Sequence, residues 1–446
     1  MHIRWFVLLL GSLLLFGNYF AYDLPASLLK PLQTYLDSSD AIFNYYFGLF
    51  YSLYSLPNIV LPFYGGWLAD KFGSAQLMIY LSLIVCSGQI VFSAGVQTKS
   101  YYLMLAGRLL FGIGSESLSV VQSQVTSRWF KNEELTLALA INLCVGRLGS
   151  VLNDVLSPFI ALHVGTVPGA MWVGSLMCVG SMLCSIKLSS IETRSQPFYT
   201  IANTDADDSD LPQILLQEDQ SVEPPSALLS AGRFWLIVCC IAVIYATLIP
   251  FNSIHSALLQ YKWYFGDPET SARVMGIPDT ISALLTPFLG LFVDYYGHRI
   301  KIIIICCLLT ISCHLFFAFA PVGLPIGPIP ALVALGIAYA MVLTLWSSIP
   351  LIVPPNLTAT AFGISTSTLN FSLTVFPLIV AFLMTSDATF FSVELFFVSC
   401  GLVAAIVSCL LLRVDMKFYD SALERDCLTD RRNISPNREH IHMHVM

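Results

Sequence analysis

The chain has 446 residues, of which 56% are hydrophobic and only 11% are charged. Soluble proteins carry about 25% charged residues, so this composition excludes an ordinary water-soluble protein and predicts a surface that faces mostly lipid. The net charge of −7 argues against a nucleic-acid partner.

Long apolar stretches follow one another along almost the whole sequence. A membrane-spanning helix needs about 20 apolar residues, so these stretches predict an all-α membrane protein with twelve transmembrane helices. The first is expected to remain as a helix rather than to be cleaved as a signal peptide, because no small-residue cleavage site follows and the apolar run continues to Ala21. The expected ranges are 4–25, 43–69, 75–97, 101–127, 134–158, 167–188, 232–254, 272–295, 299–320, 328–351, 358–385 and 390–413.

One long polar break divides these stretches into two groups of six. It is rich in Asp and Glu with several Pro and Ser, a composition typical of a solvated linker. The predicted organisation is an N-terminal six-helix half (1–188), an acidic cytoplasmic linker (189–231), a C-terminal six-helix half (232–413) and a cytoplasmic tail (414–446). Two six-helix halves are the plan of many secondary transporters.

The distribution of Lys and Arg predicts the orientation. Cytoplasmic loops of membrane proteins carry an excess of these residues. On the side that would hold both termini, Lys and Arg residues occur at Arg4, in the linker, in the tail and in most of the loops. The other side has only Lys30, Lys99, Lys262 and Arg273. Both termini are therefore expected to be cytoplasmic.

A short motif occurs once in each half, between two apolar stretches. The first copy contains Gly66, Asp70 and Gly73; the second contains Gly290, Asp294 and Gly297, followed by Arg299. We call these the first and second Gly-x-x-x-Asp loops. A duplicated loop indicates two related halves, and Asp70 and Asp294 are expected to help close the cytoplasmic side.

Three charged residues, Arg108, Glu116 and Arg147, lie away from the ends of predicted helices 4 and 5. A charged residue costs about 2.5–3.5 kcal/mol to insert at the centre of a membrane helix. Glu116 and Arg147 lie midway along two antiparallel helices, so they are expected at a similar depth. A carboxylate and a guanidinium suit the two ends of a zwitterion. The alternative is an ion pair that only joins the two helices. Arg108 is expected nearer the outer end, where it would touch the substrate, pair with Asp23 or bind backbone carbonyls.

Aromatic and amide side chains in other predicted helices are candidates for lining a central cavity. Trp and Tyr usually lie at the membrane interface, whereas Tyr54, Tyr245 and Trp346 lie near the middle of their helices. Asn370 is a further candidate. Ordinary helix packing is the alternative role for each of them.

The sequence shows no nucleophile–base pair and no ligand spacing for a metal, so we expect neither an enzyme nor a metal or cofactor site. His163 and His255 are expected to be exposed, where the acidity of the surroundings could act on them.

Several runs together resemble one family of transporters. The two loops resemble motif A of the major facilitator superfamily, and Arg108, Gly112 and Gly114 resemble its helix-4 motif. Within that superfamily, the chain resembles most closely the family of major facilitator superfamily domain-containing protein 1. This resemblance rests on the runs Tyr22-Asp23-x-Pro25-Ala26, Phe111-Gly112-Ile113-Gly114-x-Glu116-Ser117-Leu118, Arg147-x-Gly149-Ser150 and Thr360-Ala361-Phe362-Gly363.

The resemblance implies a lysosomal transporter that exports dipeptides passively. Glu116 and Arg147 match positions that hold the amino and carboxyl ends of the peptide, and Trp346 matches a cavity aromatic. The family works with a glycosylated single-pass lysosomal partner. Acceptor sequences for N-glycosylation occur here at Asn356, Asn370 and Asn433, none of them on the predicted lumenal side.

Two other functional classes compete with a dipeptide uniporter that works by alternating access. One is a proton-coupled carrier for an organic anion or a sugar, with Glu116 as the proton site. The other is a membrane sensor or scaffold that transports nothing. Uniport is favoured because a neighbouring Arg147 stabilises the ionised form of Glu116.

Overall fold

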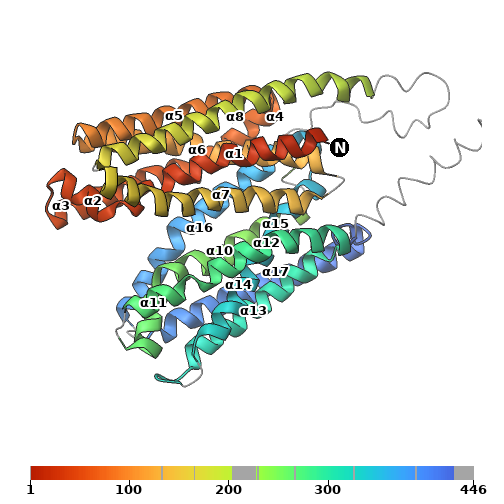
Figure 1. Ribbon diagram of the computed structural model, residues 1–446. Coiled ribbons are helices and arrows are strands. Elements are labelled where there is room, and N and C mark those ends of the chain that lie inside the picture. Colours follow the sequence, from red (N-terminus) through yellow and green to blue (C-terminus); the bar gives the residue numbers. More distant parts are fainter. Residues whose placement is uncertain are drawn as a thin grey trace, which may run out of the picture. The chain divides into compact units, whose positions relative to one another are not determined.

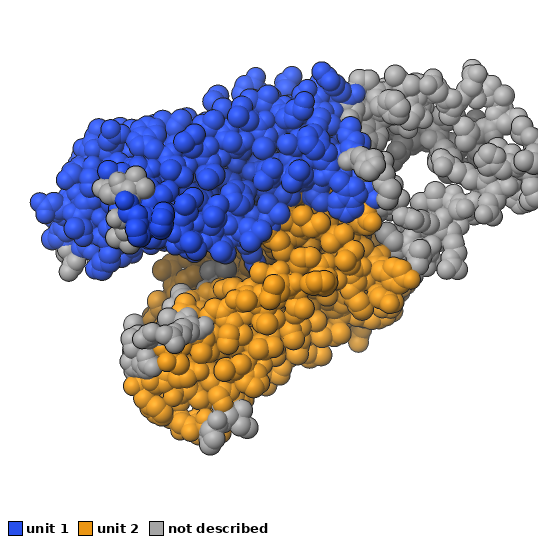
Figure 2. All heavy atoms as spheres, viewed as in Figure 1, with its two compact units in different colours: residues 1–129, 145–230, 354–367 blue, residues 130–144, 231–353, 368–446 orange. Residues whose placement is uncertain are grey.

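The computed structural model describes residues 2–131, 134–164, 166–202, 228, 231–265, 268–324, 327–386 and 389–425. Within these ranges the regular structure is entirely helical. Eleven of the described helical segments are long and apolar enough to cross a membrane, which confirms the predicted class of fold. The chain divides into two compact units, which Figure 2 colours separately.

Unit 1 comprises residues 1–129, 145–230 and 354–367. Its long helices pack side by side, as Figure 1 shows for α5 against α8 and for α8 against α1. Its elements are α1 (His2–Ser27), α2 (Leu29–Leu36), α3 (Asp40–Ser55), η1 (Pro57–Ile59), α4 (Leu61–Phe72), α5 (Ser74–Gln97), α6 (Tyr101–Phe130), η2 (Ile160–Val164) and α8 (Val167–Ala202). It also contains most of α7 (Leu135–Phe159), the turn η4 (Pro355–Leu357) and the start of α16 (Thr358–Ser386).

Unit 2 comprises residues 130–144, 231–353 and 368–446. It contains the start of α7 and the greater part of α16. Its other elements are α10 (Gly232–Leu259), η3 (Gln260–Tyr264), α11 (Pro268–Met275), α12 (Ile277–Tyr296), α13 (Arg299–Phe319), α14 (Ile329–Met341), α15 (Leu343–Ile352), α17 (Phe391–Phe418) and η5 (Ala422–Glu424).

The same pairing of helices recurs in the two units. In unit 1 the sixth spanning helix, α8, packs against the first and third, α1 and α5. In unit 2 the last spanning helix, α17, packs against the corresponding pair, α10 and α13. This internal repetition is what the duplicated Gly-x-x-x-Asp loop indicates in the sequence.

The structure departs from the predicted helices at several boundaries. The second predicted span is broken at Pro57 into α3, η1 and α4, because proline has no N–H to donate to the preceding turn. The tenth is broken after Met341. Helix α8 continues to Ala202, beyond the predicted start of the linker at 189. Most of the predicted acidic linker, residues 203–227, lies outside the described residues.

The end of the last helix is also longer than predicted. Helix α17 continues to Phe418, and the turn η5 packs back on the unit, although residues from 414 onwards are predicted to be a polar tail. The remainder of that tail, residues 426–446, is outside the described part of the chain.

Candidate functional site

A hydrogen-bonded network surrounds Glu116 in unit 1. The hydroxyl of Tyr54, from α3, lies 2.8 Å from Oε1 of Glu116 and 2.9 Å from Oγ of Ser115. Ser115 in turn donates to Oδ1 of Asn18 on α1, at 3.1 Å. Tyr54 is 6% exposed, so its hydroxyl is held by these partners rather than by water. Three helices therefore fix the position of the Glu116 carboxylate.

Arg108 lies eight residues before Glu116 on α6 and is 1% exposed. Its guanidinium donates to the carbonyl oxygens of Tyr22 at 2.9 Å and of Ala21 at 3.4 Å. Pro25 lies inside α1 and has no N–H, so the carbonyl of Ala21, four residues earlier, lacks its helical donor. Arg108 supplies that donor, which is one of the roles expected from the sequence.

Three aromatic rings surround the buried guanidinium of Arg108. Its Cζ lies 4.8 Å from the ring centroid of Phe92, 5.5 Å from that of Tyr51 and 5.7 Å from that of Phe111. Aromatic faces attract a cation, which helps to offset its burial. The side chain therefore joins α6 to the proline-containing end of α1.

Arg147 lies on α7 in the portion that belongs to unit 1, the unit that also contains Glu116, and its side chain is partly exposed. The predicted placement of Glu116 and Arg147 around one substrate remains a proposal.

Three other candidates belong to unit 2. Nε1 of Trp346, on α15, donates to the hydroxyl of Tyr245, on α10, at 3.2 Å. The two rings meet edge to face, with centroids 6.5 Å apart. Asn370 is 7% exposed on α16. The structure thus brings Trp346 and Tyr245 together.

Asp70, from the first Gly-x-x-x-Asp loop, caps the beginning of α16. Its carboxylate accepts hydrogen bonds from the N–H of Ala359 at 3.2 Å and from both the N–H and the hydroxyl of Thr360 at 2.6 Å. Gln124 donates a fourth, at 2.7 Å. The first N–H groups of a helix have no partner within it and carry a partial positive charge, which a carboxylate satisfies. Burial raises the pKa of Asp70 to about 6, while the groups of Thr360 and Ala359 act in the opposite direction.

Asp294, from the second loop, does the same for α7. Its two oxygens accept from the N–H of Thr136 at 3.1 Å and of Leu137 at 2.9 Å. Arg299 approaches one of those oxygens at 3.5 Å. In both cases the carboxylate takes the N–H groups of the second and third residues of the helix, so the duplicated motif makes a duplicated contact.

The motif glycines allow this approach. A Cβ atom on Gly66 would lie 2.1 Å from the carbonyl oxygen of Ala359, and one on Gly290 would lie 2.9 Å from Cα of Leu137. Real Cβ atoms essentially never come so close to backbone, so only glycine fits at these two positions. The glycines that end the two loops, Gly73 and Gly297, have φ of 93° and 71°, a conformation that favours glycine.

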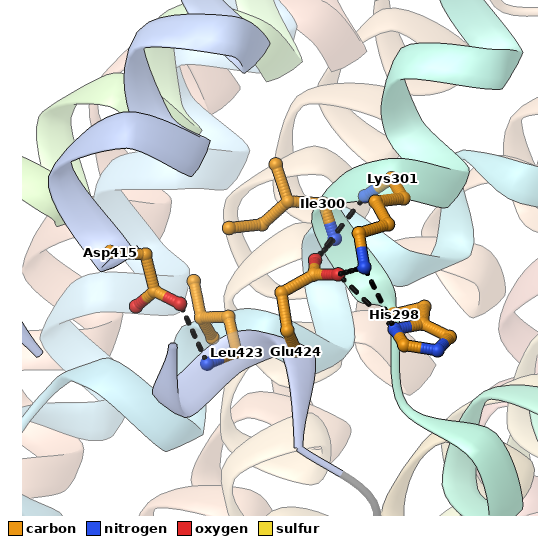
Figure 3. A network of polar contacts seen from close by, with 6 residues as sticks. All are labelled: His298, Ile300, Lys301, Asp415, Leu423 and Glu424. Carbon is orange, nitrogen blue, oxygen red and sulfur yellow. Dashed lines mark hydrogen bonds and ion pairs between the residues drawn. The ribbon is translucent and has the colours of Figure 1, made fainter. Parts of the chain in front are cut away.

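A third carboxylate cap, shown in Figure 3, joins η5 to the start of α13, directly after the second loop. Oε1 of Glu424 accepts from the N–H of Ile300 at 2.8 Å and of Lys301 at 3.3 Å, the second and third residues of α13. Its other oxygen lies 3.3 Å from both Nδ1 of His298 and Nζ of Lys301. Asp415 holds the turn in place by accepting from the N–H of Leu423 at 3.0 Å. This contact is not predicted from the sequence, because both acids lie in the predicted tail.

A buried pair in unit 2 is also missed. Nδ1 of His314, on α13, lies 2.7 Å from Oε2 of Glu394, on α17, and neither side chain is exposed. The two residues lie far apart in the sequence, each in an apolar stretch, so no local pattern indicates that they meet. Their position within predicted spans is the one available signal. His255, on α10, is 3% exposed because α11 packs against it, with Nε2 3.1 Å from the carbonyl oxygen of Met275, so the expectation that it is exposed is wrong. Among the described residues, no group of three or more His, Cys, Asp and Glu side chains is placed to hold a metal ion.

Comparison with known proteins agrees with this architecture. Residues 11–377 match the family model described as Major Facilitator Superfamily. Solved structures with the same fold include the human organic anion transporter MFSD10 (TETRAN), with a TM-score of 0.68 and 14% identity over 92% of this chain and 100% of that one. A bacterial homologue of the iron transporter ferroportin in an outward-facing state gives a TM-score of 0.69 at 13% identity, over 92% and 99%.

Similarity in sequence extends over most of the chain. The lysosomal dipeptide transporter MFSD1 of Homo sapiens is 30% identical over 412 residues, which are 89% of this chain and 83% of that protein. Its counterpart in Danio rerio is 28% identical over 448 residues, 97% and 91% of the two chains. The chain is therefore a membrane transporter that belongs to the major facilitator superfamily and, within it, to the MFSD1 family.

Proposed function

We propose that this protein exports dipeptides across the lysosomal membrane by alternating-access uniport. The relatives that are lysosomal dipeptide transporters match most of the chain and supply the substrate class and the compartment. The proposed binding site holds a zwitterionic peptide between Glu116 and Arg147. Tyr54, Tyr245, Trp346 and Asn370 are proposed to line the cavity, and Arg108 to support it from α6.

The observation that carries this proposal is the way unit 1 holds Glu116. A carboxylate within a membrane-spanning helix is costly, and a helix contact alone could be made with Ser or Asn at lower cost. Tyr54 takes up one carboxylate oxygen at 2.8 Å and orients the group. An ammonium group is the natural partner for the remaining acceptor positions, and the amino end of a dipeptide provides one.

The two Gly-x-x-x-Asp loops are proposed to act as gates. Asp70, in the N-terminal half of the sequence, binds the first turn of α16 in the C-terminal half, and Asp294, in the C-terminal half, binds the first turn of α7 in the N-terminal half. Breaking or making these contacts would therefore accompany the rocking of one half against the other. Under the predicted topology, with both termini cytoplasmic, the two contacts lie on the cytoplasmic side. Gly66, Gly73, Gly290, Gly297 and Arg299 support them.

A glycosylated single-pass accessory protein is proposed as a partner. Of the three acceptor sequences for N-glycosylation, Asn370 is buried on α16 and Asn356 lies in the turn η4 beside the contact made by Asp70. Asn433 is outside the described residues. A lysosomal membrane protein without glycans of its own would gain protection from proteases through such a partner.

The proposal is tested by dipeptide flux in liposomes that contain the purified full chain. Glu116→Gln and Arg147→Ala should each lower uptake by at least about tenfold, since each loses one charge-assisted bond worth about 1.5–3 kcal/mol. Asp37→Asn, at an exposed helix end, is the matched control and should transport normally. Full transport in either site variant would contradict the site. Absence of dipeptide transport in the unaltered protein would favour a different substrate or a sensor.

A further inference from the structure

One exposed stripe runs along α8 and changes in character toward the C-terminal end of that helix. Its members recur every three or four residues, the spacing that places side chains on one face of a helix. They are Trp172, Leu176, Gly180, Leu183, Lys187, Ser190 and Arg194. The two leucines are 68% and 59% exposed on a helix that is long and apolar enough to span a membrane, so this part of the stripe faces lipid. We call Lys187, Ser190 and Arg194 the cationic end of the stripe.

The length of the stripe matches the thickness of a membrane. Tryptophan is enriched at membrane interfaces, and Trp172 begins the stripe. At 1.5 Å per residue, Lys187 lies about 22 Å and Arg194 about 33 Å from Trp172 along the helix axis. The hydrocarbon core of a bilayer is about 30 Å thick. With Trp172 at one interface, Lys187 therefore lies just inside the opposite edge of the core and Arg194 just outside it.

Helix α1, which lies beside α8 in Figure 1, supports this depth. The two helices run antiparallel, because Leu24 lies against Gly174 whereas Ser181 donates to the carbonyl oxygen of Leu13 at 3.0 Å. Extending this register by eight residues from Leu13 brings Trp5 to the level of the cationic end of the stripe. A second tryptophan thus marks the same interface.

The two cations of the stripe are not neutralised within the protein. Among the described residues, neither Lys187 nor Arg194 makes an ion pair or a side-chain hydrogen bond. The acid on α8, Glu192, is 2% exposed and faces inward, where it pairs with Arg128 and accepts from Nε1 of Trp129 at 2.8 Å. The outward face from Lys187 to Arg194 therefore has only positive charge.

An anionic phospholipid matches both parts of this stripe. Its acyl chains would lie on the exposed leucines, and its phosphate would bind the cations through charge-assisted hydrogen bonds. A soluble anion would use only the cationic end, and a neutral lipid only the apolar part.

The spacing of the two cations selects among anionic lipids. The long side chain of Lys187 can extend to the edge of the core, where the phosphodiester of a lipid lies. Arg194 is about 10 Å further along the axis, beyond the reach of that phosphodiester. A second phosphate at this outer level is present in a lipid whose inositol ring bears a phosphomonoester.

We propose that the cationic end of the stripe binds a phosphorylated inositol phospholipid. Lys187 binds the phosphodiester, Arg194 binds the phosphomonoester on the ring, and the Ser190 hydroxyl donates between them. Under the predicted topology this is a site in the cytoplasmic leaflet. The inference goes beyond the proposed transport function and does not depend on it, because its test measures lipid binding rather than flux.

The test titrates labelled phosphatidylinositol and labelled phosphatidylinositol phosphate into the full chain in a neutral detergent. The unaltered protein should bind the phosphorylated lipid about fivefold more tightly, since one cation near an anionic surface contributes about this factor. Lys187→Gln should weaken the binding of both lipids about fivefold. Arg194→Gln should weaken only the binding of the phosphorylated lipid and so abolish the preference. Both side chains are exposed, so the fold should be retained.

Lys71→Gln is the matched control. It removes one exposed cation from the end of α4 in the same unit, where Nζ of Lys71 lies 4.7 Å from the ring centroid of Trp67. Binding of both lipids should be unchanged. A loss equal to that of Lys187→Gln would overturn the proposal, because attraction to any surface cation would then explain the binding.

Two further results would overturn it. One is equal binding of the two lipids by the unaltered protein, or an equal loss of both in Arg194→Gln. The other comes from the soluble head group, glycerophosphoinositol phosphate, which lacks acyl chains for the apolar part of the stripe. It should compete at least about tenfold more weakly than the lipid. Equal competition would assign the site to a soluble anion instead of a lipid.

Discussion

The hydroxyl of Tyr54 on α3 lies 2.8 Å from Oε1 of Glu116 on α6, and no other described hydrogen bond reaches that carboxylate. A single phenolic hydrogen can be donated to only one acceptor, so when Tyr54 donates to Glu116 the neighbouring Ser115 acts as donor toward Tyr54 or Asn18. The carboxylate is thereby held in one orientation while its second oxygen stays available. This relationship makes Tyr54 a positioning residue for the proposed peptide site.

Removal of the Tyr54 hydroxyl should impair transport without removing the charge of Glu116. We expect Tyr54→Phe to lower dipeptide uptake by about tenfold, because a hydrogen bond to a charged group contributes about 1.5–3 kcal/mol. The matched control is Ser115→Ala, which alters the same network but leaves the bond to Glu116 in place. Michaelis constants and maximal rates in liposomes are the measurements. Equal losses in the two variants would mean that the network only stabilises the fold.

The proposed site recognises the two ends of a peptide, so blocked ends should bind poorly. N-acetylation removes the cation that Glu116 would hold, and C-amidation removes the anion that Arg147 would hold. Each blocked dipeptide should compete at least about tenfold more weakly than the free one, from the loss of one charge-assisted bond. Competition assays against a labelled dipeptide measure this. Blocked peptides that compete as well as free ones would rule out recognition of the zwitterion.

Uniport predicts that dipeptide movement is not accompanied by protons. A bound zwitterion has both charges that the site needs, so loading requires no proton on Glu116. Liposomes that contain a pH-sensitive dye should therefore show no change on dipeptide entry down its own gradient. A dye signal that follows peptide uptake and disappears in Glu116→Gln would instead identify a proton symporter.

The glycines of the two Gly-x-x-x-Asp loops should not tolerate a methyl group. Glycine to alanine within a helix normally stabilises a protein by about 0.5–1 kcal/mol. Gly66→Ala and Gly290→Ala should have the opposite effect, because the added Cβ would come within 2.1 Å and 2.9 Å of the backbone of Ala359 and Leu137. A lower Tm and slower transport are expected for both.

Gly180→Ala is the control for that comparison, since a Cβ added to Gly180 on α8 meets nothing within 4 Å. It should be neutral or stabilising. If Gly66→Ala behaved like Gly180→Ala, the close approach of Gly66 to the start of α16 would not persist in the working protein.

The helical fold follows from hydropathy, because length and apolar composition decide whether a segment spans a membrane. The break at Pro57 and the short helices α2 and α11 depend on local geometry that average hydropathy does not report. The duplicated loop predicts that Asp70 and Asp294 act alike. The partners of the two carboxylates are the N–H groups of the second and third residues of α16 and α7. Tertiary packing decides these partners, and the sequence pattern does not contain that information.

The role of Arg108 shows the same limit. Its cost within a membrane helix marks it as important, but only the structure shows that Pro25 leaves the carbonyl of Ala21 in need of a donor. The contact between His314 and Glu394 cannot be predicted from charges that are close in sequence, because the two residues lie on separate helices, α13 and α17. Spacing along one helix predicts a shared face, whereas contacts between helices require the fold.

The anchoring of η5 by Asp415 and Glu424 has a practical consequence for shortening or labelling the protein. Hydropathy alone would place the end of the last helix near 413 and mark everything after it as dispensable. A cut there would remove both acids, uncap α13 and leave Lys301 and His298 without their shared carboxylate. Affinity tags and fluorescent fusions should therefore begin after Arg425, so that the second Gly-x-x-x-Asp loop keeps the turn that packs against Gly297.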